Sequence, residues 1–504
     1  MRKNSMNQIK SGALISYFAI GISIVSALLY TPWMKNQIGD SNYGLYTLVS
    51  SLISIFLMDF GLGTSVTRFV AKYRAENNQK SIRDTLGYVF KLYLLIDIGI
   101  IISLSIVYLF LADIYVGLNK SEIIILRKVF VIFASYSVLA FPFSPLAGIL
   151  NAYEKFIQLK LCDLFQKLFA IFLIVICLLL DYGVVALVAM NAISGLSAIG
   201  IKLYLVLKKT NVKPDFKTKD RALLRGLMGF SIWITILALA QRMYMNLVPS
   251  ILGITSNSME IARFAPASQL EGYFFTFANA INGLFLPTIA RYVAQGDNKA
   301  IDILAKKVGR YQIIVLGLLF TGIATVGTTF VGLWMGEEYE ISGFCTMLMI
   351  IPSLFLYSQQ IFNTLLSVKN KVKYQACASL VTGLMNVVLA FSLTPKYGVL
   401  GAAISICITY STNCIVLNFI YRKYLNQDLK DFYLKVFARY IPLIFLVILS
   451  SNMCFIFLDV NGWRGLIIKI LIVTILYSAI MIIGGTDKGE REKIKQKLHF
   501  RGIR

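Results

Sequence analysis

Apolar stretches long enough to cross a lipid bilayer recur along the whole chain. Most are about 17 to 25 residues long, the length that an α-helix needs to span roughly 30 Å of hydrocarbon. The strands of a membrane barrel need only about 10 residues of alternating polarity, so these stretches predict helices. The expected fold is an all-α polytopic membrane protein with about fourteen transmembrane helices. The expected spans are residues 12–32, 43–67, 86–111, 126–147, 160–180, 183–207, 224–250, 258–288, 309–334, 341–366, 374–394, 398–421, 434–458 and 463–484.

The overall composition agrees with this class. Hydrophobic residues make up 57% of the 504 residues and charged residues only 15%, whereas soluble domains average about 25% charged residues. The longest polar stretch, residues 208–220, is too short to bury a core, so no sizeable soluble domain is expected. The first apolar run is longer than the hydrophobic region of a signal peptide, and no small-residue cleavage site follows it. We therefore expect a retained first helix.

Basic residues give the chain a net charge of +24, and they gather in alternate loops. This asymmetry follows the positive-inside rule and places both termini in the cytoplasm. The charge is therefore a topology signal with some attraction to anionic lipid, and no nucleic-acid partner is expected. The outward loops 33–42 and 335–341 are poor in Lys and Arg. The basic segments are residues 72–83, 208–221, 291–307, 369–373, 422–423 and 488–504.

Cofactor chemistry has no support in the sequence. Nearly all of the seven cysteines lie inside apolar runs, none forms a C-x-x-C pair, and the single histidine is His499. We interpret the cysteines as small packing residues and expect no zinc site, redox pair or other cofactor. No G-x-x-x-x-G-K-[ST] motif occurs, so ATP hydrolysis by this chain is not expected.

Two segments recur at similar offsets. Residues 71–75 (AKYRA) resemble residues 290–294 (ARYVA), an offset of 290 − 71 = 219, and both end a long apolar run. Residues 181–186 resemble residues 396–401 (396 − 181 = 215), each with a Tyr-Gly-Val turn where a positive φ suits the glycine. Each repeat contains six helices, an even number, so both halves enter the membrane in the same direction. Two such halves are typical of a transporter with a central cavity between them. The predicted parts are an N-lobe of helices 1–6 (residues 1–210), a C-lobe of helices 7–12 (211–425) and an appended helix pair with a basic tail (426–504).

The segment 59–73, DFGLGTSVTRFVAKY, resembles the end of the second helix of bacterial polysaccharide flippases, and residues 43–46, YGLY, resemble the start of that helix. These are Wzx-type exporters of the MOP superfamily, related to lipid II flippases and MATE-type multidrug exporters. The resemblance covers nearly the whole chain in helix number, length and repeat offset. Specific motifs occur in helices 2 and 8 and in the two Tyr-Gly-Val turns.

The resemblance implies a function and a set of partners. The implied function is the movement of a polyprenyl-diphosphate-linked oligosaccharide from the cytoplasmic to the outer leaflet of the plasma membrane by alternating access. The implied partners are this lipid-linked substrate and the membrane lipids, with polysaccharide polymerases and glycosyltransferases as further candidates.

Such a substrate needs cations inside the membrane, because a buried diphosphate without partners is costly. Arginine suits phosphate, since its planar guanidinium donates two parallel hydrogen bonds. Arg242, well inside predicted helix 7, is the first candidate, and an internal ion pair with Glu271 or Glu260 is the alternative. Arg263 in predicted helix 8 is the second candidate, with snorkelling or pairing with Glu260 as the alternative.

Two acidic residues are candidates for binding a coupling proton or cation. Asp59 lies in the inner half of predicted helix 2, where a helix-packing hydrogen bond is the alternative. Glu271 lies near the middle of predicted helix 8, and its alternative role is to pair with Arg242. At the offset of 219, Asp59 corresponds to Ala278 and Arg242 to Ser23, so neither charge belongs to the repeated pattern.

Arg68 and Lys72 lie at the cytoplasmic mouth of helix 2. Contact with lipid headgroups is the simpler interpretation, and capture of an anionic substrate headgroup is the functional one. Transport energy can come from an ion gradient or from the membrane potential, which is worth about 2.3 kcal/mol per charge per 100 mV.

Other function classes fit the sequence less well. A MATE-type cation antiporter needs acidic residues facing its substrate, whereas the deep arginines favour an anion. A polyprenyl-linked glycosyltransferase or polymerase needs a large outward loop, and no outward loop here exceeds about fifteen residues. We therefore expect a transporter and not an enzyme, while a scaffold role in a synthesis complex stays open.

Overall fold

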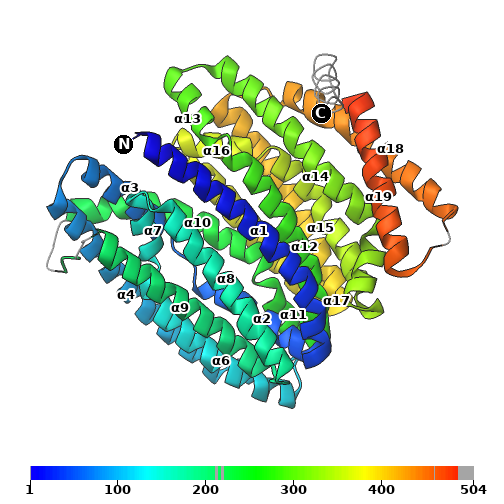
Figure 1. Ribbon diagram of the computed structural model, residues 1–504, viewed down its shortest axis with the longest axis horizontal. Helices are drawn as coiled ribbons and strands as arrows, with labels where there is room; N and C mark the ends of the chain where they lie inside the picture. The colour runs from blue at the N-terminus through cyan, green and yellow to red at the C-terminus, as the bar shows by residue number, and fades with distance from the viewer. Residues whose placement is uncertain (1, 211–213, 217–220, 459, 486–504) are drawn as a thin grey trace, which may run out of the picture. The chain divides into compact units, whose positions relative to one another are not determined.

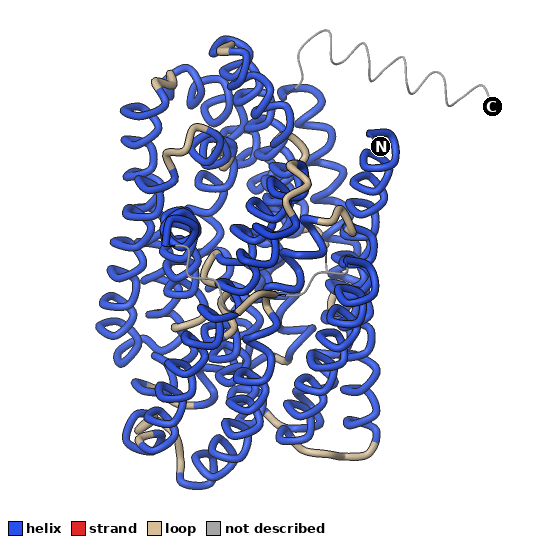
Figure 2. The backbone as a smooth tube through the Cα atoms, turned by 90° about the vertical axis from the view of Figure 1, so that its left-hand side faces the viewer, coloured by secondary structure: helices blue, strands red, loops and turns tan. Residues whose placement is uncertain are grey.

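The computed structural model describes residues 2–210, 214–216, 221–458 and 460–485. Every regular element within these ranges is a helix, which confirms the predicted all-α class (Figures 1 and 2). The basic tail at 488–504 and the loop lysines Lys213, Lys217 and Lys219, which support the topology prediction, lie outside the described residues.

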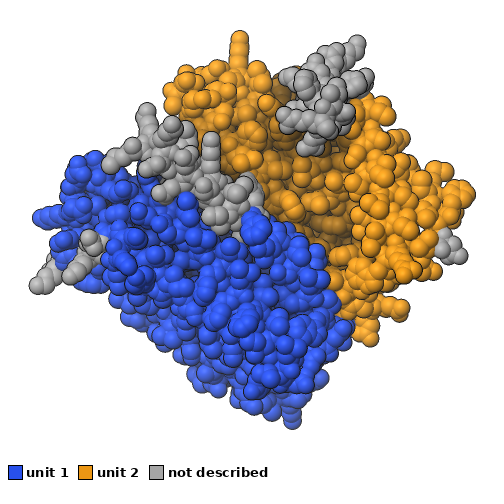
Figure 3. Space-filling model, viewed as in Figure 1, with its two compact units in different colours: residues 1–265, 379–402 blue, residues 266–378, 403–504 orange. Residues whose placement is uncertain are grey.

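The chain divides into two compact units (Figure 3). Unit 1 comprises residues 1–265 and 379–402, and unit 2 comprises residues 266–378 and 403–504. The division into lobes at residues 210 and 425 rests on the sequence repeat and stays a prediction.

Unit 1 is built from long helices joined by short turns. Helix α8 packs against α1 and α9, and α4 packs against α3 and α6. The helices are α1 (Arg2–Ile38), α2 (Asp40–Phe56), α3 (Leu62–Ala75), α4 (Gln79–Leu109), α5 (Leu111–Ile114), α6 (Lys120–Ala140), η1 (Phe141–Phe143), α7 (Pro145–Ala152), α8 (Phe156–Leu179), α9 (Val184–Thr210), α10 (Arg221–Met245) and α11 (Val248–Thr255).

Unit 2 is centred on α14, which packs against α15, α18 and α19. Helices α12 and α17 each contribute residues to both units. The remaining helices are α12 (Ser258–Gly283), α13 (Leu286–Gln295), α14 (Asn298–Met335), η2 (Glu337–Tyr339), α15 (Glu340–Ser358), α16 (Ile361–Val368), α17 (Val372–Leu425), α18 (Leu429–Ile456), α19 (Gly462–Ile480) and η3 (Met481–Gly485).

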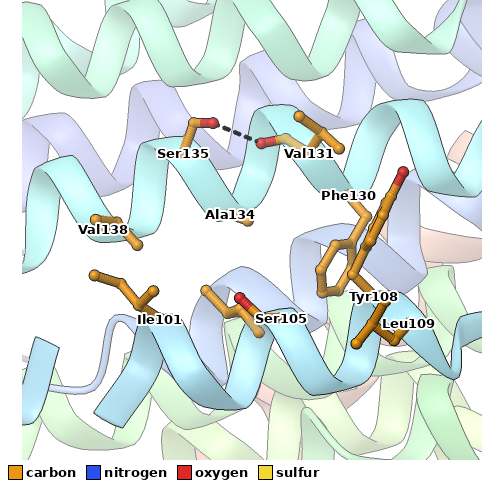
Figure 4. Close-up of a pocket in the computed structure, with 10 residues that line it drawn as sticks. Ile101, Ser105, Tyr108, Leu109, Phe130, Val131, Ala134, Ser135 and Val138 are labelled. Carbon is orange, nitrogen blue, oxygen red and sulfur yellow. Dashed lines mark hydrogen bonds between the residues drawn. The ribbon is translucent and has the colours of Figure 1, made fainter. Parts of the chain in front are cut away.

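The outer surface of the helices is apolar, which is the reverse of a water-soluble protein. On α4, Leu95 and Ile98 are 68% and 59% exposed, whereas the carboxylate-bearing Asp97 between them is only 7% exposed. Figure 4 shows an apolar groove between α4 and α6, where the hydroxyl of Ser135 donates to the carbonyl of Val131 within its own helix at 2.9 Å. Polar groups satisfied inside one helix are suited to contact with lipid, so this surface supports an integral membrane protein.

Nine helical stretches among the described residues are long and apolar enough to span a membrane. The predicted count of about fourteen is not settled by this number, because several predicted spans consist of two shorter helices and α17 contains two predicted spans, 374–394 and 398–421. The expected continuous helix over residues 43–67 is wrong, since α2 ends at Phe56 and α3 begins at Leu62.

Helix breaks recur in both units. The second helix often begins with a proline in its first turn, where the missing N–H costs no hydrogen bond; examples are Pro145, Pro249 and Pro287. In membrane transporters, discontinuous helices commonly form substrate and ion sites. The breaks lie at residues 57–61, 141–144, 246–247, 284–285 and 359–360.

The two Tyr-Gly-Val turns differ in backbone conformation. Gly398 has φ 52°, as the sequence suggested, and a Cβ there would lie 2.2 Å from the Glu260 carboxylate. In the first copy, Asp181 and not Gly183 has the positive φ, at 55°. The expectation of a left-handed glycine is therefore confirmed for one copy and wrong for the other.

Candidate functional site

A charged cavity of about 480 Å³ lies in unit 1, lined by residues from α1, α8 and α9. The α8 residues recur every three or four positions, which places them on one face of the helix. Asn191 of α9 donates to the hydroxyl of Tyr46 at 2.8 Å, and Ser194 donates to the carbonyl of Gln166 at 2.8 Å. These bonds hold α8, α9 and α2 together around the cavity. The lining residues are Ile20, Lys160, Asp163, Gln166, Lys167, Ala170, Asn191 and Ser194.

Lysines outnumber carboxylates at this cavity. Asp163 pairs with Lys202 at 2.9 Å and more loosely with Lys160 at 3.7 Å. Lys167, by contrast, has no hydrogen-bond or ion-pair partner within the part of the chain that the structure describes. Lys167 is the twelfth residue of α8, so it lies about 16 Å along that helix from its start. Two lysines, Lys160 and Lys167, and one aspartate, Asp163, line the cavity, which leaves a surplus of one positive charge.

This arrangement suits an anionic ligand that carries hydroxyl groups. A lysine at membrane depth without a carboxylate is costly, and a phosphate group offsets that cost with charge-assisted hydrogen bonds. The amides of Gln166 and Asn191 and the hydroxyl of Ser194 offer partners for sugar hydroxyls. The cavity is therefore a candidate site for a phosphorylated headgroup.

Asp59 lies in the break between α2 and α3, where Phe60 and Gly61 have φ 49° and 66°. Its carboxylate accepts the N–H of Gly63 at 3.1 and 3.2 Å, and the hydroxyl of Tyr93 donates to the same carboxylate. The hydroxyl of Thr235 donates to the carbonyl of Phe60. Side chains from α4 and α10 thus donate hydrogen bonds to groups in the helix break. This agrees with the structural role considered for Asp59, a helix-packing hydrogen bond. Its role in ion coupling stays a prediction.

Replacing Tyr93 with phenylalanine is expected to lower the free energy of unfolding by about 1 to 3 kcal/mol, because the half-buried Asp59 carboxylate loses a hydrogen bond. Equilibrium unfolding of the detergent-solubilised protein measures this change. The matched control is Tyr108→Phe in the apolar groove of Figure 4. Equal stability of the two variants would contradict the assignment.

Asp97 is a buried acidic residue that the sequence prediction missed. It lies one helical turn from Tyr93 on the buried face of α4, and its Oδ1 has no hydrogen-bond partner among the described residues. A carboxylate at this depth without a partner is suited to carrying a proton.

Glu271 is buried in unit 2, where its Oε1 accepts the hydroxyl of Tyr357 at 2.7 Å. The bond links α12 to the end of α15, directly before the helix break at residues 359–360. The ion-coupling role predicted for Glu271 has this geometry in its favour and stays a prediction.

The two deep arginines have different surroundings within unit 1. Arg263 pairs with Glu260 at 2.7 Å, and Glu260 also accepts the N–H of Val399 at 2.6 Å. This pairing is the structural alternative for Arg263. Arg242 is half-buried near the end of α10 and donates to Asn246 Oδ1 at 3.3 Å. Glu260 is therefore engaged by Arg263, and Arg242 stays a candidate contact for an anion.

Arg68 and Lys72 are exposed on α3. Lys72 pairs loosely with Glu76 at 3.9 Å, one turn away. The neighbouring Arg74 donates to the carbonyl of Ala152 at 3.0 Å and so covers the end of α7. These contacts agree with a surface role at the mouth, and headgroup capture stays a prediction.

The sequence feature that singled out Arg242, an ionisable residue inside an apolar span, is shared by Lys160, Lys167 and Asp97. All three fall within predicted apolar spans, where an ionisable residue indicates a functional site. The sequence does not show that α8 and α9 enclose a cavity, and that information comes from the structure.

Long apolar helices with recurrent breaks define a polytopic membrane protein. The fold is similar to that of the lipid II flippase MurJ in an inward closed conformation, with a TM-score of 0.72, 15% identity, and coverage of 94% of this chain and 98% of that one. It is also similar to an inward-facing multidrug resistance MATE family transporter of the MOP superfamily, with a TM-score of 0.68, 12% identity, and coverage of 82% and 98%.

Residues 9–293, more than half of the chain, match the family described as "Polysaccharide biosynthesis protein", and the chain belongs to this family. The "Probable low-salt glycan biosynthesis flippase Agl15" of Haloferax volcanii is 20% identical over 205 residues. That alignment covers 40% of this chain and 42% of Agl15, so the chain matches less than half the length of this relative.

Proposed function

We propose that the chain flips polyprenyl-diphosphate-linked oligosaccharides from the cytoplasmic to the outer leaflet of the plasma membrane. The observation that supports this proposal best is the cavity of unit 1, which Lys160 and Lys167 line together with polar side chains. Family membership and the fold shared with a lipid II flippase support the same function. The chain acts as a transporter and not as an enzyme, with both termini in the cytoplasm.

The cavity lowers the barrier for the headgroup while the polyprenyl tail stays in lipid. Lysine ammonium groups replace water around the diphosphate, and the amides of Gln166 and Asn191 replace water around the sugars. The membrane potential favours outward movement of an anion from a negative interior, by about 2.3 kcal/mol per charge per 100 mV.

Alternating access supplies the movement in this proposal. The lobes at residues 1–210 and 211–425 rock against each other and so expose the headgroup to one side of the membrane at a time, and the segment 426–504 is appended to them. Arg242 contacts the diphosphate, with Arg263 as a further contact. Arg68 and Lys72 attract the headgroup at the cytoplasmic mouth.

Ion coupling in the same proposal relies on carboxylates that are buried or half-buried among the helices. Glu271 and Asp59 are the residues that the sequence singled out, and Asp97 joins them because of its burial. Each has a different surrounding: Tyr357 for Glu271, Tyr93 and Gly63 for Asp59, and no partner among the described residues for Asp97 Oδ1.

Replacing Arg242 with alanine is expected to lower the initial rate of headgroup flipping about 10-fold, because one charge-assisted contact worth about 1.5 kcal/mol is lost. Proteoliposomes that carry a fluorescent polyprenyl-diphosphate oligosaccharide measure this rate. The matched control is Arg464→Ala, an exposed arginine at the start of α19.

Three further outcomes separate the alternatives. Unchanged flipping by the Arg242 variant would keep the proposed function and remove this residue from the site. Absence of flipping together with gradient-driven efflux of a cationic dye would favour the MATE-type antiporter. Sugar transfer between polyprenyl lipids by the purified chain would favour a glycosyltransferase or polymerase.

A further inference from the structure

A second polar pocket, of about 330 Å³, lies in unit 2. It is formed where the α16–α17 and α17–α18 connections meet the first turns of α14. The predicted topology places this end of the helices on the cytoplasmic side, because residues 369–373 and 422–423 are basic. The lining residues are Asn298, Asp302, Lys369, Lys371, Tyr424, Leu425, Asn426, Gln427 and Asp428.

Two half-buried lysines face this pocket. Lys371 donates to the carbonyl of Tyr424 at 2.7 Å. Lys369 has no hydrogen-bond or ion-pair partner among the residues that the structure describes. Burial, together with the nearby charge of Lys371, lowers the pKa of Lys369. An anion in the pocket would relieve this repulsion.

The carboxylates that line the pocket are already engaged elsewhere. Asp302 pairs with Lys306, and Lys306 also binds Asp431. Asp428 caps α18, where its Oδ1 accepts the N–H of Asp431 at 3.2 Å. Among the described residues, neither Asp302 nor Asp428 forms an ion pair with Lys369 or Lys371.

The side-chain oxygen of Gln427 in this pocket lacks a hydrogen-bond donor within the described part of the chain, and a ligand could supply one. The Gln427 side chain is 8% exposed, its amide donates to the carbonyl of Leu425 at 3.4 Å, and its Oε1 has no partner among the described residues. A buried amide oxygen without a donor is costly, so an occupant with a hydroxyl group would stabilise it.

We propose that this pocket binds the headgroup of an anionic phospholipid, namely a phosphodiester that also carries a hydroxyl group. Lys369 and Lys371 contact the phosphate, and Gln427 accepts the hydroxyl. The rings of Tyr374 and Tyr424 stack at 3.6 Å beside the pocket, and the predicted topology places them on the cytoplasmic side, where aromatic residues favour the membrane interface. The proposed ligand is a membrane lipid and not the transported substrate, so this proposal does not depend on the proposed function.

The test is native mass spectrometry of the purified full chain with added phosphatidylglycerol, phosphatidylcholine or phosphatidylethanol. Wild-type protein is expected to retain phosphatidylglycerol in preference to the other two lipids. The Lys369→Gln/Lys371→Gln variant is expected to bind it about tenfold or more weakly, since each lysine near the surface contributes to anionic lipid binding. The matched control is Lys373→Gln/Lys423→Gln, which removes two nearby exposed lysines that do not line the pocket.

The hydroxyl preference has its own variant. Gln427→Leu is expected to bind phosphatidylglycerol and phosphatidylethanol equally, because phosphatidylethanol lacks the glycerol hydroxyls. If the double lysine variant does not fold, Lys369→Gln alone carries the test, with an expected loss of about fivefold. Unchanged retention by the lysine variants, or an equal loss in the control, would overturn the proposal.

A competition measurement separates the two sources of such a ligand. Retention of phosphatidylglycerol that persists against millimolar glycerol 1-phosphate supports a lipid. Displacement of the lipid by glycerol 1-phosphate at that concentration would show that the pocket serves a soluble phosphate, and would overturn the assignment to lipid.

Discussion

Replacing Lys167 with glutamine is expected to lower the initial rate of headgroup flipping about 10- to 100-fold. The lysine lies in the cavity of unit 1 with no carboxylate partner among the described residues, so its charge is available to a phosphate. One charge-assisted hydrogen bond is worth about 1.5 to 3 kcal/mol, and each 1.4 kcal/mol corresponds to about a factor of ten. The flipping assay in proteoliposomes measures the rate.

The control for this prediction is Lys128→Gln. Lys128 is an exposed lysine on α6 of the same unit and does not line the cavity. The Lys167 variant should keep the thermal stability of the wild type, because no contact within the described protein is removed. An equal rate for the Lys167 variant and the wild type would show that the cavity does not receive the phosphate.

Replacing Gly44 with alanine is expected to destabilise unit 1 by about 1 to 3 kcal/mol or more. A Cβ on Gly44 would lie 2.1 Å from the backbone carbonyl oxygen of Ser258, so the starts of α2 and α12 must move apart. The same contact region holds Glu122, whose carboxylate accepts the hydroxyls of Ser41 and Ser258. Separation of these helices therefore also weakens hydrogen bonds to a buried carboxylate.

Thermal unfolding in detergent measures the effect of Gly44→Ala. The matched control is Gly200→Ala on α9, where a Cβ would meet no atom within 4 Å. Alanine in an exposed helix is favoured over glycine by up to about 1 kcal/mol, so the control should be equally or more stable than the wild type. A Gly44 variant as stable as this control would contradict the close approach of α2 and α12.

The fold class followed from the sequence because long apolar runs allow few alternatives in a membrane. The helix breaks did not follow from it. The break at Asp59 depends on hydroxyls of Tyr93 and Thr235, which reach it from α4 and α10. Gly61 and Gly63 permit a bend in residues 43–67, but the sequence does not show that distant hydroxyls stabilise a full break there.

The candidate site could be predicted in part. The alternative pairing of Arg263 with Glu260 was visible, because residues three apart share a helix face. Lys167 was not singled out, since its importance depends on which face of α8 meets α9. That choice is made by packing between helices and not by the period of either helix alone.

The chain passes between the two units three times, at residues 265/266, 378/379 and 402/403, and each passage lies inside a helix. A flexible loop would leave the two units free to move independently, whereas a helix is stiff and resists bending and twisting. Pro266 removes one backbone hydrogen bond at the first passage, and the kink at Gly398 lies next to the third. Any rotation of one unit against the other would therefore have to bend α12 or α17, and Pro266 and Gly398 are the positions where these helices are most easily bent.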